Sequence, residues 1–256
     1  MTAKQNPLIL SIETATRSGS CALIRGETVL AVSRTEASAS SHSELLLLSV
    51  KELLEKANVT LSEIEVFAAA SGPGSFTGLR IGLATVKAFA ATMQRSCAGI
   101  PTLHAVAHAG GESERTLALF PGGRGEVFAQ LLKVERDGAV HSLEPPVHLT
   151  PQKLLEKVRD LAPLKWVGEG AQIYAEAIQA QALSQGIVFR DQSEFGDDVQ
   201  MRQREWTIGR KQTGLATDVA ELALQRFRSA DVESADELRA IYVRPSDADL
   251  NAQCHE

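Results

Sequence analysis

The chain is 256 residues long, enough for one large domain or two small ones with a sizeable buried core. Its formal net charge of −6 argues against a protein that holds nucleic acid by its own electrostatic field, so an RNA target would require a partner. The N-terminus lacks the charged head and long apolar core of a signal peptide, and no stretch approaches the roughly 18 apolar residues of a membrane span. We therefore expect a cytoplasmic protein with no membrane contact.

The three cysteines, Cys21, Cys97 and Cys254, are widely spaced and form no CxxC pair. This pattern predicts neither a disulfide framework nor a zinc ribbon. Because Cys21 and Cys97 stand in apolar surroundings, we expect them to be small core residues rather than reactive thiols.

The first part of the chain predicts an α/β arrangement. Apolar runs that end at turn residues predict strands at Leu8–Thr14, Gly19–Ile24, Val29–Ser33, Val66–Ala70 and near Cys97–Ile100. Tight turns join the first three strands, so they should form an antiparallel meander. Helical segments separate the later strands, which predicts a mixed sheet covered on both faces.

The first predicted helix, Ser43–Ala57, is more apolar than contact with one sheet face requires. Its core stripe starts at Leu46 and recurs at helical spacing, whereas Leu45, Leu47 and Leu48 fall outside that stripe. This surplus suggests a second contact surface, and core packing alone is the alternative explanation.

The stretch SGPGSFTGLRIG, residues 71–82, predicts a tight turn between a strand and a helix. Gly72 and Gly74 permit a positive φ or a close backbone approach, and Ser75 or Thr77 can cap the helix. Exposed N–H groups at a helix start favour an anion, but the glycine spacing fits neither of the two best-known phosphate loops. Contact with an anion or nucleotide and a turn that only directs the helix therefore both remain open.

Gly78 and Gly82 lie four residues apart in this helix, beside Leu79, Leu83 and Val86. Together they form a flat strip on which another helix could pack closely. Glycine costs up to about 1 kcal/mol in a helix interior, so close packing is the natural compensation for Gly82. We expect Gly82→Leu to abolish partner binding and to leave the isolated chain folded.

Beyond residue 115 the pattern predicts a second, looser α/β half. Its strands, hairpins and helices are expected at 116–120, 126–134, 139–148, 151–160, 165–171 and onward to Ala182. Thr150 as cap and Pro151 at the first position open one of these helices.

The segment Phe189–Gly214 gives the least clear pattern. Basic residues gather near Trp206, which could indicate RNA contact, but acidic residues interleave with them, and we predict a solvated loop or linker. After it, Thr217–Leu224 predicts a capped amphipathic helix. Leu238–Pro245 predicts an edge strand stopped by proline, with a disordered tail after Ser246.

Two groups could carry chemistry. His104 and His108 have the i, i+4 spacing that can hold a metal on a helix, but Glu112 is the only nearby third ligand, so ordinary histidines are expected. Glu13, at the end of the first strand, could be a carboxylate at a nucleotide site, but the sequence identifies no partner group for it. We therefore name no catalytic residue and no metal ligand. The candidates for cofactor binding are Glu13, Thr14, Gly72, Gly74 and Ser75.

Four stretches, ILSIETAT, HSELLL, SGPGSFTGLRIG and IYVRP, resemble the TsaB (YeaZ-like) proteins. The similarity is close through the N-terminal part and continues in outline; residues 121–128, PGGRGEVF, stand where many TsaB-like chains carry an Asp-Ala-Arg run. The resemblance implies an α/β, actin/hexokinase-like (ASKHA) fold of two related lobes, with mixed sheets flanked by helices. We expect an N-terminal lobe at 1–110 and a degenerate C-terminal lobe at 111–256, whose last segment could return to the first lobe.

TsaB-like proteins are the non-catalytic partner in threonylcarbamoyladenosine biosynthesis on bacterial tRNA. The resemblance implies a homodimer, and a complex with the catalytic paralogue TsaD and the ATPase TsaE that modifies adenosine 37 of tRNAs reading codons that begin with A. tRNA would be bound only through that complex, no cofactor would be intrinsic, and ATP or ADP could bind at the complex interface. The implied contact surface is formed by the first two helices, here with Leu45, Leu48, Gly78, Leu79, Gly82, Leu83 and Val86.

Two enzyme functions remain as alternatives. One is a metal-dependent threonylcarbamoyl transferase or peptidase-like enzyme that uses His104 and His108. A stoichiometric metal that is lost on His108→Ala would favour it. The other is a small-molecule kinase of the same fold, against which the missing second phosphate loop and catalytic aspartate count.

Overall fold

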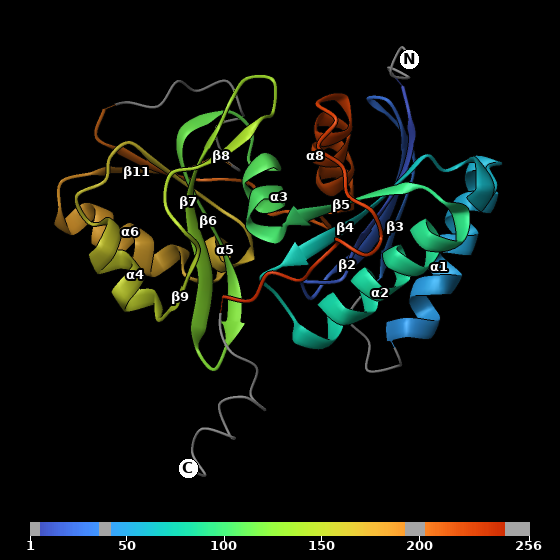
Figure 1. Cartoon of the computed structure of the whole chain (residues 1–256). Helices are drawn as coiled ribbons and strands as arrows, with labels where there is room; N and C mark the ends of the chain where they lie inside the picture. Colours follow the sequence, from blue (N-terminus) through green and yellow to red (C-terminus); the bar gives the residue numbers. More distant parts are fainter. Residues whose placement is uncertain (1–5, 36–41, 193–202, 244–256) are drawn as a thin grey trace, which may run out of the picture. The chain divides into compact units, whose positions relative to one another are not determined.

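The computed structural model describes residues 6–35, 42–192 and 203–243. The chain divides into two compact units (Figure 1). Unit 1 comprises residues 1–105 and 214–256, and unit 2 comprises residues 106–213. The chain therefore crosses between the units twice. The sequence suggested a lobe boundary at residue 110 and a last segment that could return to the first lobe.

Unit 1 is built on a five-stranded sheet in the order β3-β2-β1-β4-β5. Its strands are β1 (Leu8–Glu13), β2 (Gly19–Arg25), β3 (Thr28–Thr35), β4 (Val66–Gly72) and β5 (Ser96–Pro101). The first three strands pair antiparallel, which confirms the predicted meander, and β4 and β5 continue the sheet in parallel to β1. All six residues of β1 are buried, because helices cover both faces of the sheet.

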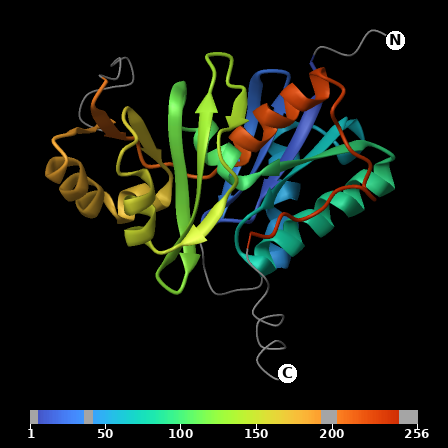
Figure 2. The same ribbon diagram turned by 60° about the vertical axis from the view of Figure 1, so that its left-hand side comes forward.

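The helices of unit 1 are α1 (His42–Ala57), the 3-10 turn η1 (Leu61–Glu63), α2 (Phe76–Met93) and α8 (Ala216–Arg228), and α3 (Thr102–His108) leads into unit 2. α1 and α2 pack on one face of the sheet, where Leu53 and Val86 join Leu10 in the apolar core. α8 packs on the other face, where the Ser11 hydroxyl donates a hydrogen bond to the Ala216 carbonyl (2.6 Å; Figure 2). Within the described residues, no helix is long and apolar enough to cross a membrane.

The glycine strip of α2 packs inside unit 1. The Thr14 hydroxyl, just after β1, donates a hydrogen bond to the Gly78 carbonyl (2.7 Å). A side chain at Gly78 would overlap the Thr14 carbonyl oxygen, and one at Gly82 would overlap the Thr14 hydroxyl. The other members of the strip are buried in the same interior, Leu79, Leu83 and Val86. Placing a partner on these five residues was therefore wrong, because Thr14 of the same unit fills the space beside the two glycines and the other three side chains are buried.

Helix α8 takes its cap from another element of unit 1. The sequence predicts a cap near Thr217, but α8 begins at Ala216, and Leu215 before it makes no side-chain bond. The Ser20 hydroxyl of β2 instead accepts hydrogen bonds from the N–H groups of Leu215 (3.2 Å) and Ala216 (3.1 Å). A cap supplied from the opposite end of the chain leaves no local spacing signal.

Unit 2 contains a seven-stranded sheet in which β11-β12-β10-β6-β7-β8 follow one another and β9 also pairs with β7. Its strands are β6 (Ser113–Gly123), β7 (Glu126–Val134), β8 (Val140–Ser142), β9 (Val147–Leu149), β10 (Leu164–Val167), β11 (Val188–Asp191) and β12 (Glu205–Ile208). Its described helices include α4 (Pro151–Val158), α5 (Glu169–Ile173) and α6 (Ala175–Ser184). Thr150 caps α4 by accepting a hydrogen bond from the Lys153 N–H (3.4 Å), as predicted.

The prediction of a solvated loop over Phe189–Gly214 is wrong for much of that segment. β12 lies in the sheet between β10 and β11, and Trp206 in it is fully buried. Its ring packs against Trp166 with centroids 5.1 Å apart, and its indole N–H donates to the Leu161 carbonyl (2.7 Å). Because the Trp206 ring is enclosed in the core of unit 2, it offers no stacking surface to RNA.

Paired charges account for the misleading pattern in this segment. The buried carboxylate of Glu205 on β12 lies 2.7 Å from the Arg190 guanidinium on the neighbouring β11. In the sequence, these two charges look like residues of a solvated surface. Their pairing becomes apparent only when β11 and β12 lie side by side in the sheet. Residues 193–202 lie outside the described residues.

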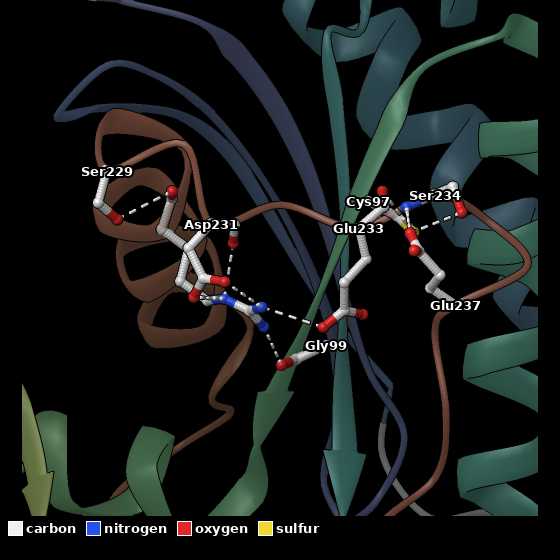
Figure 3. A network of polar contacts seen from close by, with 8 residues as sticks. Cys97, Gly99, Ser229, Asp231, Glu233, Ser234 and Glu237 are labelled. Atoms are coloured by element: carbon white, nitrogen blue, oxygen red, sulfur yellow. Dashed lines mark hydrogen bonds and ion pairs between the residues drawn. The ribbon is translucent and has the colours of Figure 1, made fainter.

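Residues 230–243, called the strap below, cross unit 1 where an edge strand was predicted. These described residues contain no strand. Glu233 exchanges two backbone hydrogen bonds with Cys97 on β5 (both 2.8 Å), and Leu238 is buried in the core. Arg226 fixes its start by contacts with Asp231 (2.8 Å), Glu233 (3.0 Å) and the Gly99 carbonyl (2.8 Å). Figure 3 labels these three partners. The tail predicted after Ser246, with Cys254, lies outside the described residues.

Gly82→Leu tests the packing of α2 against Thr14. The change gains helix propensity worth up to about 1 kcal/mol, but overpacking a fixed contact costs about 1–3 kcal/mol or more. We therefore expect the variant to unfold at a lower urea concentration than the wild type, rather than to remain folded as the sequence suggested. Ala84→Leu, on the exposed side of the same helix, is the control and should not lower the midpoint. An unchanged midpoint for Gly82→Leu would mean that the Thr14 contact yields without cost.

Candidate functional site

The ends of β1 and β4 lie at one edge of the unit 1 sheet because these strands run parallel. The loop after β1 and the glycine-rich turn after β4 meet there, and they carry all the candidates for cofactor binding, Glu13, Thr14, Gly72, Gly74 and Ser75. The Ser75 N–H donates a hydrogen bond to the Ala15 carbonyl (2.8 Å), and a side chain at Gly74 would come within 2.6 Å of that oxygen. Gly74 is therefore required for the contact between the two loops.

The first turn of α2 is capped by Ser75, as predicted. The Ser75 hydroxyl accepts a hydrogen bond from the Gly78 N–H (3.2 Å), which satisfies one of the donors that open a helix. The N–H groups of Ser75 and Gly78 thus both have acceptors inside the protein. Binding of an anion or nucleotide at this turn stays a prediction.

Glu13 is a fully buried carboxyl group at the end of β1. One of its oxygens accepts the Thr16 N–H (2.8 Å), and the other accepts the Thr16 hydroxyl (2.9 Å). Burial raises the pKa of Glu13 from its ordinary value of 4.5 to about 7, although these hydrogen bonds oppose the rise. The carboxyl group thus holds the loop after β1 in place and has no exposed surface for a ligand.

His104 and His108 lie on the short helix α3, and both are partly buried. Glu112, the third ligand considered with them, forms a long ion pair with Arg136 (4.0 Å). Within either unit taken by itself, the described His, Cys, Asp and Glu residues include no group of three close enough to share a metal ion.

Cys21 and Cys97 are buried and free, which confirms their prediction as core residues. Burial raises the pKa of Cys21 to about 12 and that of Cys97 to about 11. Both thiols therefore stay protonated and unreactive at neutral pH.

The outer side of α1 and α2 carries apolar residues that unit 1 does not bury. Leu47 and Leu48 of α1 are 53% and 50% exposed, whereas Leu45 is half-buried. On α2 the exposed stripe repeats every four residues through Phe76, Arg80, Ala84 and Ala88. The surplus leucines of α1 thus do form an exposed surface. On α2 the sequence predicted the partner contact at the glycine strip, but that side of the helix is buried.

Each unit contains a mixed sheet flanked by helices, and this arrangement defines an α/β protein of the actin/hexokinase-like (ASKHA) class, as predicted. Residues 34–224 match the family model described as TsaD: tRNA N6-adenosine threonylcarbamoyltransferase. Because this match covers more than half of the chain, the chain belongs to the TsaD family.

Relatives within this family confirm the resemblance to TsaB (YeaZ-like) proteins. The tRNA threonylcarbamoyladenosine biosynthesis protein TsaB of Escherichia coli is 27% identical over 241 residues, which cover 92% of this chain and 94% of the relative. Its counterpart in Bacillus subtilis is 24% identical over 182 residues, which cover 70% of this chain and 79% of the relative. The solved structure of YeaZ from Pseudomonas aeruginosa has the same fold, with a TM-score of 0.68 at 22% identity over 92% of this chain and 99% of that one.

Glu13→Gln tests the protonation of the buried carboxyl group. Between pH 4.5 and 7 the unfolded chain ionises Glu13 while the folded chain keeps it protonated, so stability falls as pH rises through this window. From pH 5 to pH 8 the wild type should lose about 2.5 kcal/mol more unfolding free energy than Glu13→Gln, whose amide still pairs with Thr16. Urea unfolding of both proteins at the two pH values measures the difference. Equal losses would show that Glu13 titrates normally in the folded state.

Proposed function

We propose that this chain is the non-catalytic, dimerising partner of a TsaD-like catalytic paralogue in threonylcarbamoyladenosine formation on tRNA. Its membership of the TsaD family and its similarity to the threonylcarbamoyladenosine biosynthesis proteins of Escherichia coli and Bacillus subtilis support this function. The complex transfers a threonylcarbamoyl group to adenosine 37 of tRNAs reading codons that begin with A. A TsaE-like ATPase completes the complex, and ATP or ADP binds at its interface.

The exposed apolar side of α1 and α2 is the observation that carries the partner function. Two adjacent leucines, Leu47 and Leu48, are half-exposed on a helix whose other side is already packed on the sheet. Burying a leucine side chain fully contributes about 1.5–3 kcal/mol of binding free energy. An interface that covers Leu47 and Leu48 is therefore more stable than one that covers polar side chains. The small residues Ala84 and Ala88 on α2 let a second helix approach closely. The homodimer and the complex with the paralogue use the same side and therefore exclude one another.

We assign the chemistry to the paralogue because two candidate reactive groups of this chain serve its own fold. Glu13 is buried and hydrogen-bonded to Thr16, and the Ser75 hydroxyl caps α2. The net charge of −6 supports a complex in which the partner, rather than this chain, holds tRNA.

Leu48→Glu tests this interface. The wild-type chain should form a stoichiometric heterodimer with the TsaD-like paralogue of the same cell, measured by size-exclusion chromatography with light scattering. Burying a carboxylate where a leucine packed should weaken the heterodimer by about a hundredfold or more. Leu183→Glu is the matched control, since Leu183 on α6 is 64% exposed and lies in unit 2. If wild-type chain and paralogue elute separately, with and without nucleotide and the ATPase, the proposed function is wrong.

A further inference from the structure

An exposed aromatic and cationic cluster lies where α2 begins and the strap ends. Phe76 is 36% exposed, and Tyr242 and Ile241 of the strap are 50% and 38% exposed. The rings of Phe76 and Tyr242 have centroids 5.5 Å apart, and the Arg80 guanidinium carbon lies 3.8 Å from the centroid of the Phe76 ring. These four residues, called the Phe76 cluster, come from segments more than 150 residues apart in the sequence.

Backbone contacts hold the two segments of the cluster together. The Ile241 N–H donates a hydrogen bond to the Ser71 carbonyl (2.7 Å). Gly72 has a φ of +116°, and a side chain there would overlap the Ile241 carbonyl oxygen. Further back in the strap, Leu238 is fully buried in the core. The cluster is therefore preorganised, and a partner that docks on it pays little conformational entropy.

Arg80 is the polar group of the cluster. Its guanidinium is held over the Phe76 ring by a cation–π contact, with the i, i+4 spacing that places both side chains on one side of α2. Among the described residues, no hydrogen bond or ion pair engages Arg80. A planar guanidinium fixed in this way presents its N–H edge to a carboxylate in bidentate geometry.

We infer that the Phe76 cluster anchors the TsaD-like paralogue through a segment that places an apolar side chain against Phe76 and Tyr242 and an Asp or Glu carboxylate on Arg80. This inference rests on the proposed function and names the chemistry of its interface. Tyrosine and arginine are enriched among the residues that dominate binding energy at protein interfaces. Phe76 and Arg80 also continue the exposed stripe of Ala84 and Ala88 on the same helix, so the cluster extends the proposed contact surface to the strap.

An acidic protein segment fits this surface better than RNA. Nucleic acid is held by several cations that each neutralise a phosphate, and the cluster supplies one cation on a chain with a net charge of −6. The exposed rings and the Ile241 side chain instead form an apolar surface around one charge, which is the composition of an interface core with a single charged pair.

The test measures heterodimer affinity by isothermal titration calorimetry at low and at raised salt. Arg80→Gln and Tyr242→Ala should each weaken binding by about tenfold or more, and Arg80→Lys should recover only part of the loss because an ammonium lacks the planar fork. The wild-type affinity should fall more steeply with salt than that of Arg80→Gln. Arg136→Gln removes the same charge from an exposed position in unit 2 and serves as the matched control. Thermal unfolding of each isolated variant checks that it is folded.

The outcomes separate this inference from the proposed function. If the wild type does not bind the paralogue, both are wrong. If the wild type binds and folded Arg80→Gln and Tyr242→Ala bind within twofold of it, only the Phe76 cluster is excluded as an anchor. If these variants weaken self-association in analytical ultracentrifugation but leave the heterodimer unchanged, the cluster serves a second copy of this chain. If they lose tRNA binding by the assembled complex without losing the heterodimer, its ligand is RNA, and the inference is overturned.

Discussion

The close approach of α2 to the end of β1 is the contact on which the rest of unit 1 depends. Thr14 reaches the backbone of α2 because Gly78 and Gly82 present no side chain. Each glycine costs the helix up to about 1 kcal/mol, and burial of the neighbouring leucines and valine, at about 1.5–3 kcal/mol each, offsets that cost. The same approach sets Ser75 against Ala15 and so brings the loop after β1 and the glycine-rich turn together. Steric access, more than any polar group, determines this arrangement.

This contact also decides which side of α2 is available for function. With the glycine side committed to β1, only the side with Phe76, Arg80, Ala84 and Ala88 faces outward. The turn that resembles a phosphate loop gives two of its N–H groups to the protein itself, and the nearby Glu13 is buried and satisfied. The glycine-rich turn thus holds the end of β1 against the start of α2.

Local signals in the sequence are enough to predict much of the fold and little of the site. The meander, the Thr150 cap and the Ser75 cap could all be predicted, because each depends on residues a few positions apart. Contacts across the chain could not be predicted in this way. The Ser20 hydroxyl caps α8, Glu205 pairs with Arg190 on another strand, and Thr14 fills the place assigned to a partner helix. Glycine spacing indicated close packing correctly, but spacing carries no information about which element makes the contact.

Unit 1 is built from two separate stretches of the chain, so it can be completed only after the second stretch has been synthesised. Residues 6–105 provide the whole five-stranded sheet and the helices on one face, but α8 covers the other face and the strap contacts the outer edge of β5. Both belong to the last segment of the chain, so the nascent sheet exposes an apolar face and a bare strand edge until unit 2 has been translated. Unit 2 is continuous and can pack first. A chain stalled on the ribosome before residue 214 is therefore a natural client for a chaperone.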